Sequence, residues 1–155
     1  MRRFSVVLVA VAVAASTAGA AHGTVAKTSG AAYLQLQDGH GFAAIRVRGN
    51  FFGRVGQGRI VSTANVDRHG CERRKRLKHG LRLCRGEAIT FKTPTDSRWR
   101  VRLRGHEISA TGFVRGCLRL NARNTGPTGT FRINDPVMHA WPRSSTRYRL
   151  GTGTC

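Results

Sequence analysis

A dense group of basic residues lies between two cysteines near the middle of the chain. The segment from Cys71 to Cys84 contains Glu72 and the six cations Arg73, Arg74, Lys75, Arg76, Lys78 and Arg82. Guanidinium and ammonium groups form strong, charge-assisted hydrogen bonds with phosphate, sulfate and carboxylate groups. The segment therefore predicts a binding surface for a polymer that carries such anions.

A second basic pattern occupies residues 97–104, where Trp99, Val101 and Leu103 alternate with the four arginines Arg98, Arg100, Arg102 and Arg104. In a β-strand, alternate side chains point to the same face and lie about 6–7 Å apart. Four guanidinium groups at that spacing repel one another unless anions lie among them. We therefore expect this ladder to form part of the same anion-binding surface.

The four cysteines, Cys71, Cys84, Cys117 and Cys155, predict two disulfides if the protein is exported. His79 and Gly80 can turn the chain between Cys71 and Cys84, which favours a Cys71–Cys84 hairpin bridge and leaves Cys117–Cys155 as the second pair. An alternative is a zinc site made by His69, Cys71, His79 and Cys84. Zinc ligands usually stand closer together in the sequence, so we expect no bound metal.

The sequence contains no recognisable catalytic motif. The seven carboxylates are scattered, and the chain lacks a Gly-x-Ser-x-Gly elbow, a phosphate-binding Walker loop and a His-Glu-x-x-His motif. We therefore expect that the protein is not an enzyme and that it binds no cofactor.

One short fragment offers an alternative. The residues Arg115-Gly116-Cys117-Leu118-Arg119-Leu120-Asn121 resemble the nucleophile motif of the L,D-transpeptidases, exported all-β enzymes that cross-link peptidoglycan. The resemblance implies that Cys117 is the acyl-accepting nucleophile, with His106 as the nearest candidate base and Arg119 at the position of the family's arginine. It covers about seven residues, and Val114 and Arg115 replace the Ser/Thr and His of the family motif.

Alternation of apolar and polar residues with period two runs through the chain and predicts β-strands. Besides residues 97–104, it appears at 44–48, 118–120, 131–133 and 148–150. Turns are expected at glycine-rich points, namely Asp38–Gly41, Gly56–Gly58, Arg85–Gly86, Arg104–Gly105 and Asn124–Gly129. This pattern indicates an all-β fold, a small antiparallel β-sandwich or barrel with two disulfides.

The first 20 residues read as a cleaved secretory signal peptide, because Arg2 and Arg3 precede an apolar run and then small residues up to Ala20. Residues 21–31 would form a flexible lead, and residues 32–155 a single domain. The full chain has 27 basic and 7 acidic residues, a net charge of +20. Cleavage of the signal peptide would remove Arg2 and Arg3 and leave 25 basic residues and a net charge of +18. We expect no membrane-spanning segment in the cleaved protein. We expect a secreted or cell-envelope protein.

This charge favours an anionic partner such as teichoic acid, lipopolysaccharide, a sulfated glycan or DNA bound without sequence preference. Sequence-specific recognition of nucleic acid is not expected, because Phe91, Trp99 and Phe131 fall at inward positions of the alternation. The alternative is a structural envelope protein without an anionic ligand. In that case the excess of Arg over Lys reflects a GC-rich genome and a need for charged strand edges.

Overall fold

The computed structural model describes residues 29–95, 97–126, 128–134 and 147–152. These residues form eight strands and one 3-10 turn, and the prediction of an antiparallel all-β fold is confirmed. In chain order the elements are β1 (Ser29–Gln37), β2 (His40–Ser62), β3 (Asp67–His69), β4 (Arg73–Arg76), the 3-10 turn η1 (Lys78–Gly80), β5 (Arg82–Lys92), β6 (Arg98–Asn124), β7 (Thr130–Asn134) and β8 (Arg147–Thr152).

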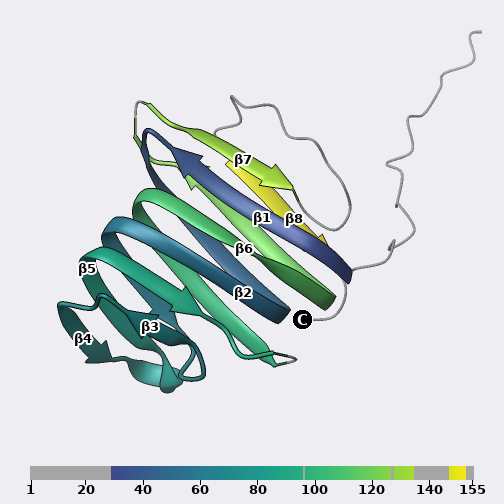
Figure 1. The fold of residues 1–155 in the computed structure, drawn as a ribbon, viewed down its shortest axis with the longest axis horizontal. Helices are drawn as coiled ribbons and strands as arrows, with labels where there is room; N and C mark the ends of the chain where they lie inside the picture. The colour runs from purple at the N-terminus through teal and green to yellow at the C-terminus, as the bar shows by residue number, and fades with distance from the viewer. Residues whose placement is uncertain (1–28, 96, 127, 135–146, 153–155) are drawn as a thin grey trace, which may run out of the picture.

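All eight strands belong to one sheet, in which β3, β5, β2, β6, β1 and β7 are neighbours in that order (Figure 1). Strand β4 pairs with β5, and β8 pairs with β6. The sheet folds over on itself because β2 and β6 are long, bent strands that take part in both of its layers. We call the layer that contains β1 and β7 the front layer, and the layer that contains β8 the back layer (Figure 1).

The bending of the two long strands explains their double pairing. Residues 41–48 of β2 lie between two parts of β6, residues 98–105 on one side and 117–124 on the other. Residues 49–54 of β2 then pair with residues 109–114 of β6, which pair in turn with β1. The first half of β2 therefore lies in the back layer, and the chain passes to the front layer near Gly49.

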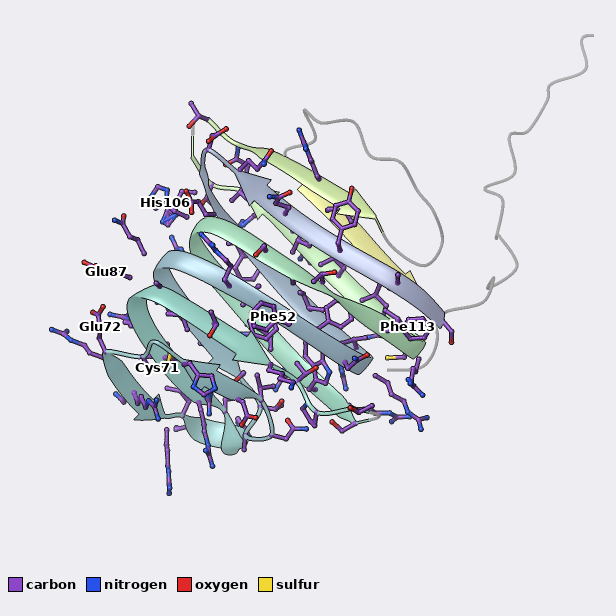
Figure 2. All side chains as sticks on the ribbon, viewed as in Figure 1. Phe52, Cys71, Glu72, Glu87, His106 and Phe113 are labelled. Carbon is purple, nitrogen blue, oxygen red and sulfur yellow. A yellow bond between two sulfur atoms is a disulfide. The ribbon has the colours of Figure 1, made fainter. Side chains whose placement is uncertain are left out.

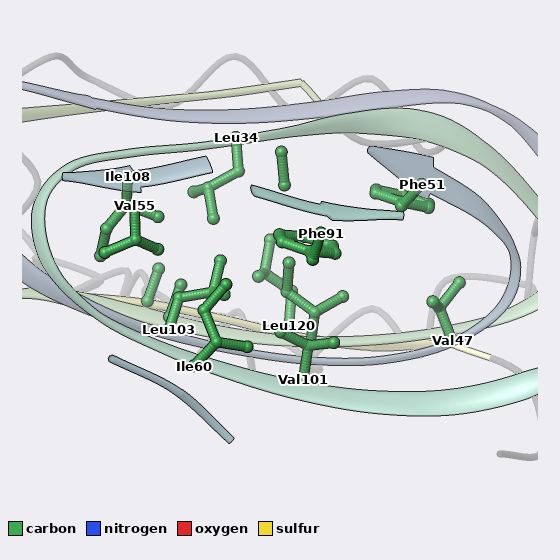
Figure 3. Close-up of a cluster of buried hydrophobic side chains, with 14 of the residues drawn as sticks. Leu34, Val47, Phe51, Val55, Ile60, Phe91, Val101, Leu103, Ile108 and Leu120 are labelled. Carbon is green, nitrogen blue, oxygen red and sulfur yellow. The ribbon is translucent and has the colours of Figure 1, made fainter. Parts of the chain in front are cut away.

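The core lies between the layers, and the alternation in the sequence fills it. Every odd residue of β2 from Gly41 to Val55 is buried, and so are Trp99, Val101 and Leu103 of β6. Figure 3 shows part of this core, with Val47, Phe51, Val55, Val101 and Leu103 among the labelled side chains enclosed by strands on both sides. Because the inward positions carry the apolar residues, the arginines between them must point outward.

Three of the predicted turns are wrong. Gly56–Gly58 lies inside β2, Arg85–Gly86 inside β5 and Arg104–Gly105 inside β6. At Gly56–Gly58 the chain forms an irregularity rather than a turn: Gln57 has a φ of 37°, and the pairing with β6 shifts between Gly56 and Arg59. The chain does leave the strands at Asp38–Gly39 and at Thr125, Gly126, Thr128 and Gly129, as expected.

Strand β1 begins at Ser29, so residues 29–31 of the predicted flexible lead are part of the sheet, paired with residues 113–115. The predicted signal peptide, residues 1–20, lies outside the described residues. Among the residues that are described, no helix is long and apolar enough to cross a membrane.

Candidate polyanion-binding surface

The predicted basic hairpin is formed by β4 and β5 and is closed by a Cys71–Cys84 disulfide, with 5.2 Å between the Cα atoms. Both sulfurs are therefore bonded to each other, which removes two of the four ligands of the zinc alternative. His79 and Gly80 make the turn, with φ values of 57° and 69°. A hollow of about 290 Å³ lies beside the disulfide and is lined by the cations Arg68, Arg74, Lys75, Arg76 and Arg82.

Arg68 of β3 enters this hollow although it lies outside the predicted segment. Its pKa is lowered from the usual value, first by burial and then by the charges of Arg82 and Arg74, while Asp67 opposes the shift. Burial alone would lower this pKa, and the nearby positive charges of Arg82 and Arg74 lower it further because like charges repel. An anion placed among them would relieve this repulsion.

The four ladder arginines of β6 point outward in the back layer, as predicted, and β2 adds further arginines beside them. Arg46 lies opposite Arg100 on one side and opposite Arg119 on the other, and Arg48 lies opposite Arg98. Residues directly opposite each other in an antiparallel sheet share a face, about 4.5–5.5 Å apart, and like charges there are destabilising. The predicted ladder is therefore one part of a wider basic face.

The strand register also joins the ladder to the hairpin. Arg73 of β4 lies opposite Arg85 of β5, Arg85 opposite Arg59 of β2, and Arg59 opposite Arg104 of β6. The same row continues through Phe42 to Arg123. We call these six residues the arginine row: Arg73, Arg85, Arg59, Arg104, Phe42 and Arg123.

Neighbouring strands are about 4.8 Å apart, so the arginine row extends about 24 Å across the sheet. On the neighbouring strand β8, Arg123 is paired with Arg147. The five arginines of the arginine row and the outward arginines next to them form what we call the arginine face: Arg46, Arg48, Arg59, Arg73, Arg85, Arg98, Arg100, Arg102, Arg104, Arg119 and Arg123. All of these side chains are exposed except Arg59 and Arg100, which are half-buried.

The described carboxylates are few, and one of them, Glu72, stands next to Arg73, where its Oε1 accepts a hydrogen bond from the Glu87 N–H. Within the described ranges, the ion pair between side chains joins Arg54 and Glu107, with 3.0 Å between Nη2 and Oε2, outside the arginine face. Glu107 also lines a hollow of about 510 Å³ together with Asp38, Glu87 and His106. Figure 2 shows Glu72, Glu87 and His106 along one edge of the molecule. Among the side chains that the structure describes, no ion pair involves an arginine of the arginine row.

A histidine pair lies where the arginine row meets this edge. The rings of His40 and His106 have centroids 4.5 Å apart. The pKa of His40 is lowered by burial and, to a smaller extent, by the charges of His106 and Arg104. His40 is therefore held in its neutral form to lower pH than an ordinary histidine, which limits any further positive charge at this point.

The front layer has a different surface. Tyr33, Phe52 and Phe113 are exposed there, by 41%, 54% and 43%, and Tyr33 and Phe52 lie on either side of Thr111. Figure 2 shows Phe52 and Phe113 on the strands of this layer. The two layers therefore present chemically distinct surfaces, one rich in arginine and one with separate aromatic rings.

The arrangement implied by the transpeptidase resemblance is not found. Cys117 is disulfide-bonded, so its sulfur is not a free thiolate. Its predicted partner, Cys155, lies outside the described residues. On β2, His106 is paired with His40, and Cys117 is paired with Arg48, eight residues further along the strand. His106 and Cys117 are therefore about 27 Å apart. A nucleophile and its base must be within hydrogen-bond reach.

Sequence reasoning found the ladder and the hairpin but missed the arginines that connect them. Arg59 and Arg85 each stand alone between uncharged residues, and only the register of β4, β5, β2 and β6 makes them neighbours. The sequence pattern does indicate outward positions for Arg46, Arg48 and Arg119, because each alternates with apolar residues as the ladder arginines do.

Comparison of the chain with protein-family models, with curated proteins and with solved structures gave no match.

Proposed function

We propose that this protein binds anionic polymers outside the cytoplasm through its arginine face and the adjoining basic hairpin. The arginine row carries the proposal, because it places five guanidinium groups in a line across neighbouring strands. Such a line has no evident structural role, since directly opposed arginines weaken strand pairing. A bound polyanion would convert this repulsion into attraction along the whole line.

The spacing of the charges suits a polymer better than a single small anion. The outward positions form a grid of about 4.8 Å across the strands and about 6.7 Å along them. A chain of phosphate, sulfate or carboxylate groups can contact several guanidinium groups at once and release the counterions bound to it. Teichoic acid, lipopolysaccharide, sulfated glycans and DNA all carry such groups.

Two observations support the proposed extracytoplasmic location. The Cys71–Cys84 disulfide is compatible with an oxidising compartment, and the first 20 residues have the pattern of a signal peptide. Polymers with repeated anionic groups are abundant in cell envelopes. The export of the protein would bring the arginine face to these ligands.

The proposal is tested by the salt dependence of binding to heparin, a linear sulfated polymer. The affinity of the purified protein should fall steeply and linearly on a plot of log K against log salt concentration. The triple variant Arg59→Ser/Arg85→Ser/Arg104→Ser removes the centre of the arginine row. It should reduce the magnitude of this slope by about two, taking for each of the three lost contacts the value of about 0.7 that applies to single-stranded nucleic acid.

A matched control removes the same number of charges from the front layer, by Lys92→Ser/Arg115→Ser/Arg132→Ser. Its slope should stay close to that of the unaltered protein. Equal slopes for the two triple variants would show that net charge, and not the arginine face, governs binding. Failure of the unaltered protein to bind heparin at physiological salt would favour a structural role without a polyanion ligand.

A further inference from the structure

The arginine row contains one residue that is not basic, and a hollow lies beside it. This hollow has a volume of about 210 Å³. The side chains of Phe42 and Val61 form its apolar part, and the hollow is also lined by four arginines, Arg59, Arg102, Arg104 and Arg123. Pockets that enclose a whole small-molecule ligand are usually about 300–1,000 Å³. The hollow therefore suits one ring-sized group of a larger molecule.

Phe42 is half-buried and lies in register between Arg104 and Arg123. The guanidinium carbon of Arg123 is 5.6 Å from the centroid of the Phe42 ring. The hollow thus offers an aromatic ring and nearby planar guanidinium groups, both of which stack on flat, unsaturated rings. The surrounding charges would hold anions on either side of such a ring.

We propose that the preferred ligand of the arginine face is single-stranded nucleic acid, with one base placed in the hollow beside Phe42 and the phosphates along the arginine row. This inference rests on the proposed function and narrows its ligand class. The combination of a basic track with an aromatic stacking position is how proteins bind single strands without sequence preference. Double-stranded nucleic acid could not place a base in the hollow, because its bases are paired and stacked inside the duplex.

The chemistry of the hollow disfavours a sugar ring at the same place. The side chains of Phe42 and Val61 offer no hydrogen-bond partner, and a sugar would bring several hydroxyl groups against them. Burying a hydroxyl group without a partner is unfavourable. A nucleobase presents its apolar face instead and keeps its polar groups at the edge of the ring.

The test compares three probes at one salt concentration: a single-stranded oligonucleotide, an abasic oligonucleotide of the same length and charge, and heparin. The protein should bind the base-containing strand at least about fivefold more tightly than the abasic strand. The variant Phe42→Leu keeps an apolar side chain but removes the ring. It should bring the two oligonucleotides to similar affinity and leave binding of the abasic strand and heparin unchanged.

The variant Phe113→Leu is the matched control, because it removes an exposed ring from the front layer, and it should not alter any affinity. A fluorescent base analogue, 2-aminopurine, gives a second readout that needs no variant, since stacking on binding should quench its emission.

Equal affinity for the two oligonucleotides, or unquenched 2-aminopurine, would overturn the inference while leaving polyanion binding intact. An equal loss of heparin and oligonucleotide binding in Phe42→Leu would also overturn it. If none of the three probes binds, the proposed function itself fails.

Discussion

Thr93 shows how a single buried polar side chain fixes the backbone under the core. Its Oγ1 accepts a hydrogen bond of 2.6 Å from the Phe51 N–H and lies 3.3 Å from the Phe51 carbonyl oxygen, to which it can donate. Thr93 is only 3% exposed, so water does not replace these contacts. The Phe51 ring packs edge-on against Trp99, with 5.4 Å between the ring centroids. Thr93 therefore holds the strand that positions the largest core side chains.

The variant Thr93→Val should lower the free energy of unfolding by about 1–3 kcal/mol, because it leaves the buried Phe51 N–H without its partner. Thr93→Ser retains the hydroxyl group and is the control; it should lose clearly less stability. Chemical denaturation of the two variants measures the difference. Similar losses in both would mean that the methyl group, and not the hydroxyl, matters at this position.

The direction of most side chains could be predicted at the level of single residues. The alternation placed Trp99, Val101 and Leu103 inward and the four ladder arginines outward, and the structure agrees. The joining of ladder and hairpin could not be predicted, because it depends on which strands are neighbours. Arg59 and Arg85 are 26 positions apart in the sequence, and nothing local indicates that they lie opposite each other.

At the scale of strands, inward-facing glycines are part of the core. Gly53 lies opposite Phe91, and Gly112 lies opposite Phe51. In each pair the aromatic ring lies close to the glycine, where a Cβ atom would collide with it. An aromatic neighbour that covers a strand glycine compensates for its missing side chain. Glycine alone therefore does not identify a turn here, which explains why turns predicted within β2, β5 and β6 were wrong.

The variant Gly112→Ala should destabilise the protein by about 1–3 kcal/mol, the usual cost of overfilling a packed core. The new Cβ would collide with the Asn50 carbonyl oxygen and with Phe51. Gly126→Ala is the control, since the nearest atoms there lie 3.5 Å away, at ordinary contact distance. Its melting temperature should stay close to that of the unaltered protein. A drop as large as that of Gly112→Ala would contradict the proposed role of close strand packing.

At the scale of the whole molecule, the folded sheet separates chemically different surfaces. The back layer and the hairpin carry the arginine face, whereas the front layer exposes Tyr33, Phe52 and Phe113. The composition predicted a strong positive charge but not its concentration on one face. That concentration arises because β2 and β6 each contribute an arginine-bearing segment to the back layer. A polyanion would therefore meet one side of the protein first.

The most direct test of this account is to map which arginines a bound polymer covers. Phenylglyoxal modifies accessible arginines, and mass spectrometry of the digested protein reports the extent at each position. With saturating heparin, Arg59, Arg85 and Arg104 should be strongly protected, and Arg132 of the front layer should react as it does in the free protein. Uniform protection of all four arginines, or protection of Arg132 alone, would contradict the assignment of binding to the arginine face.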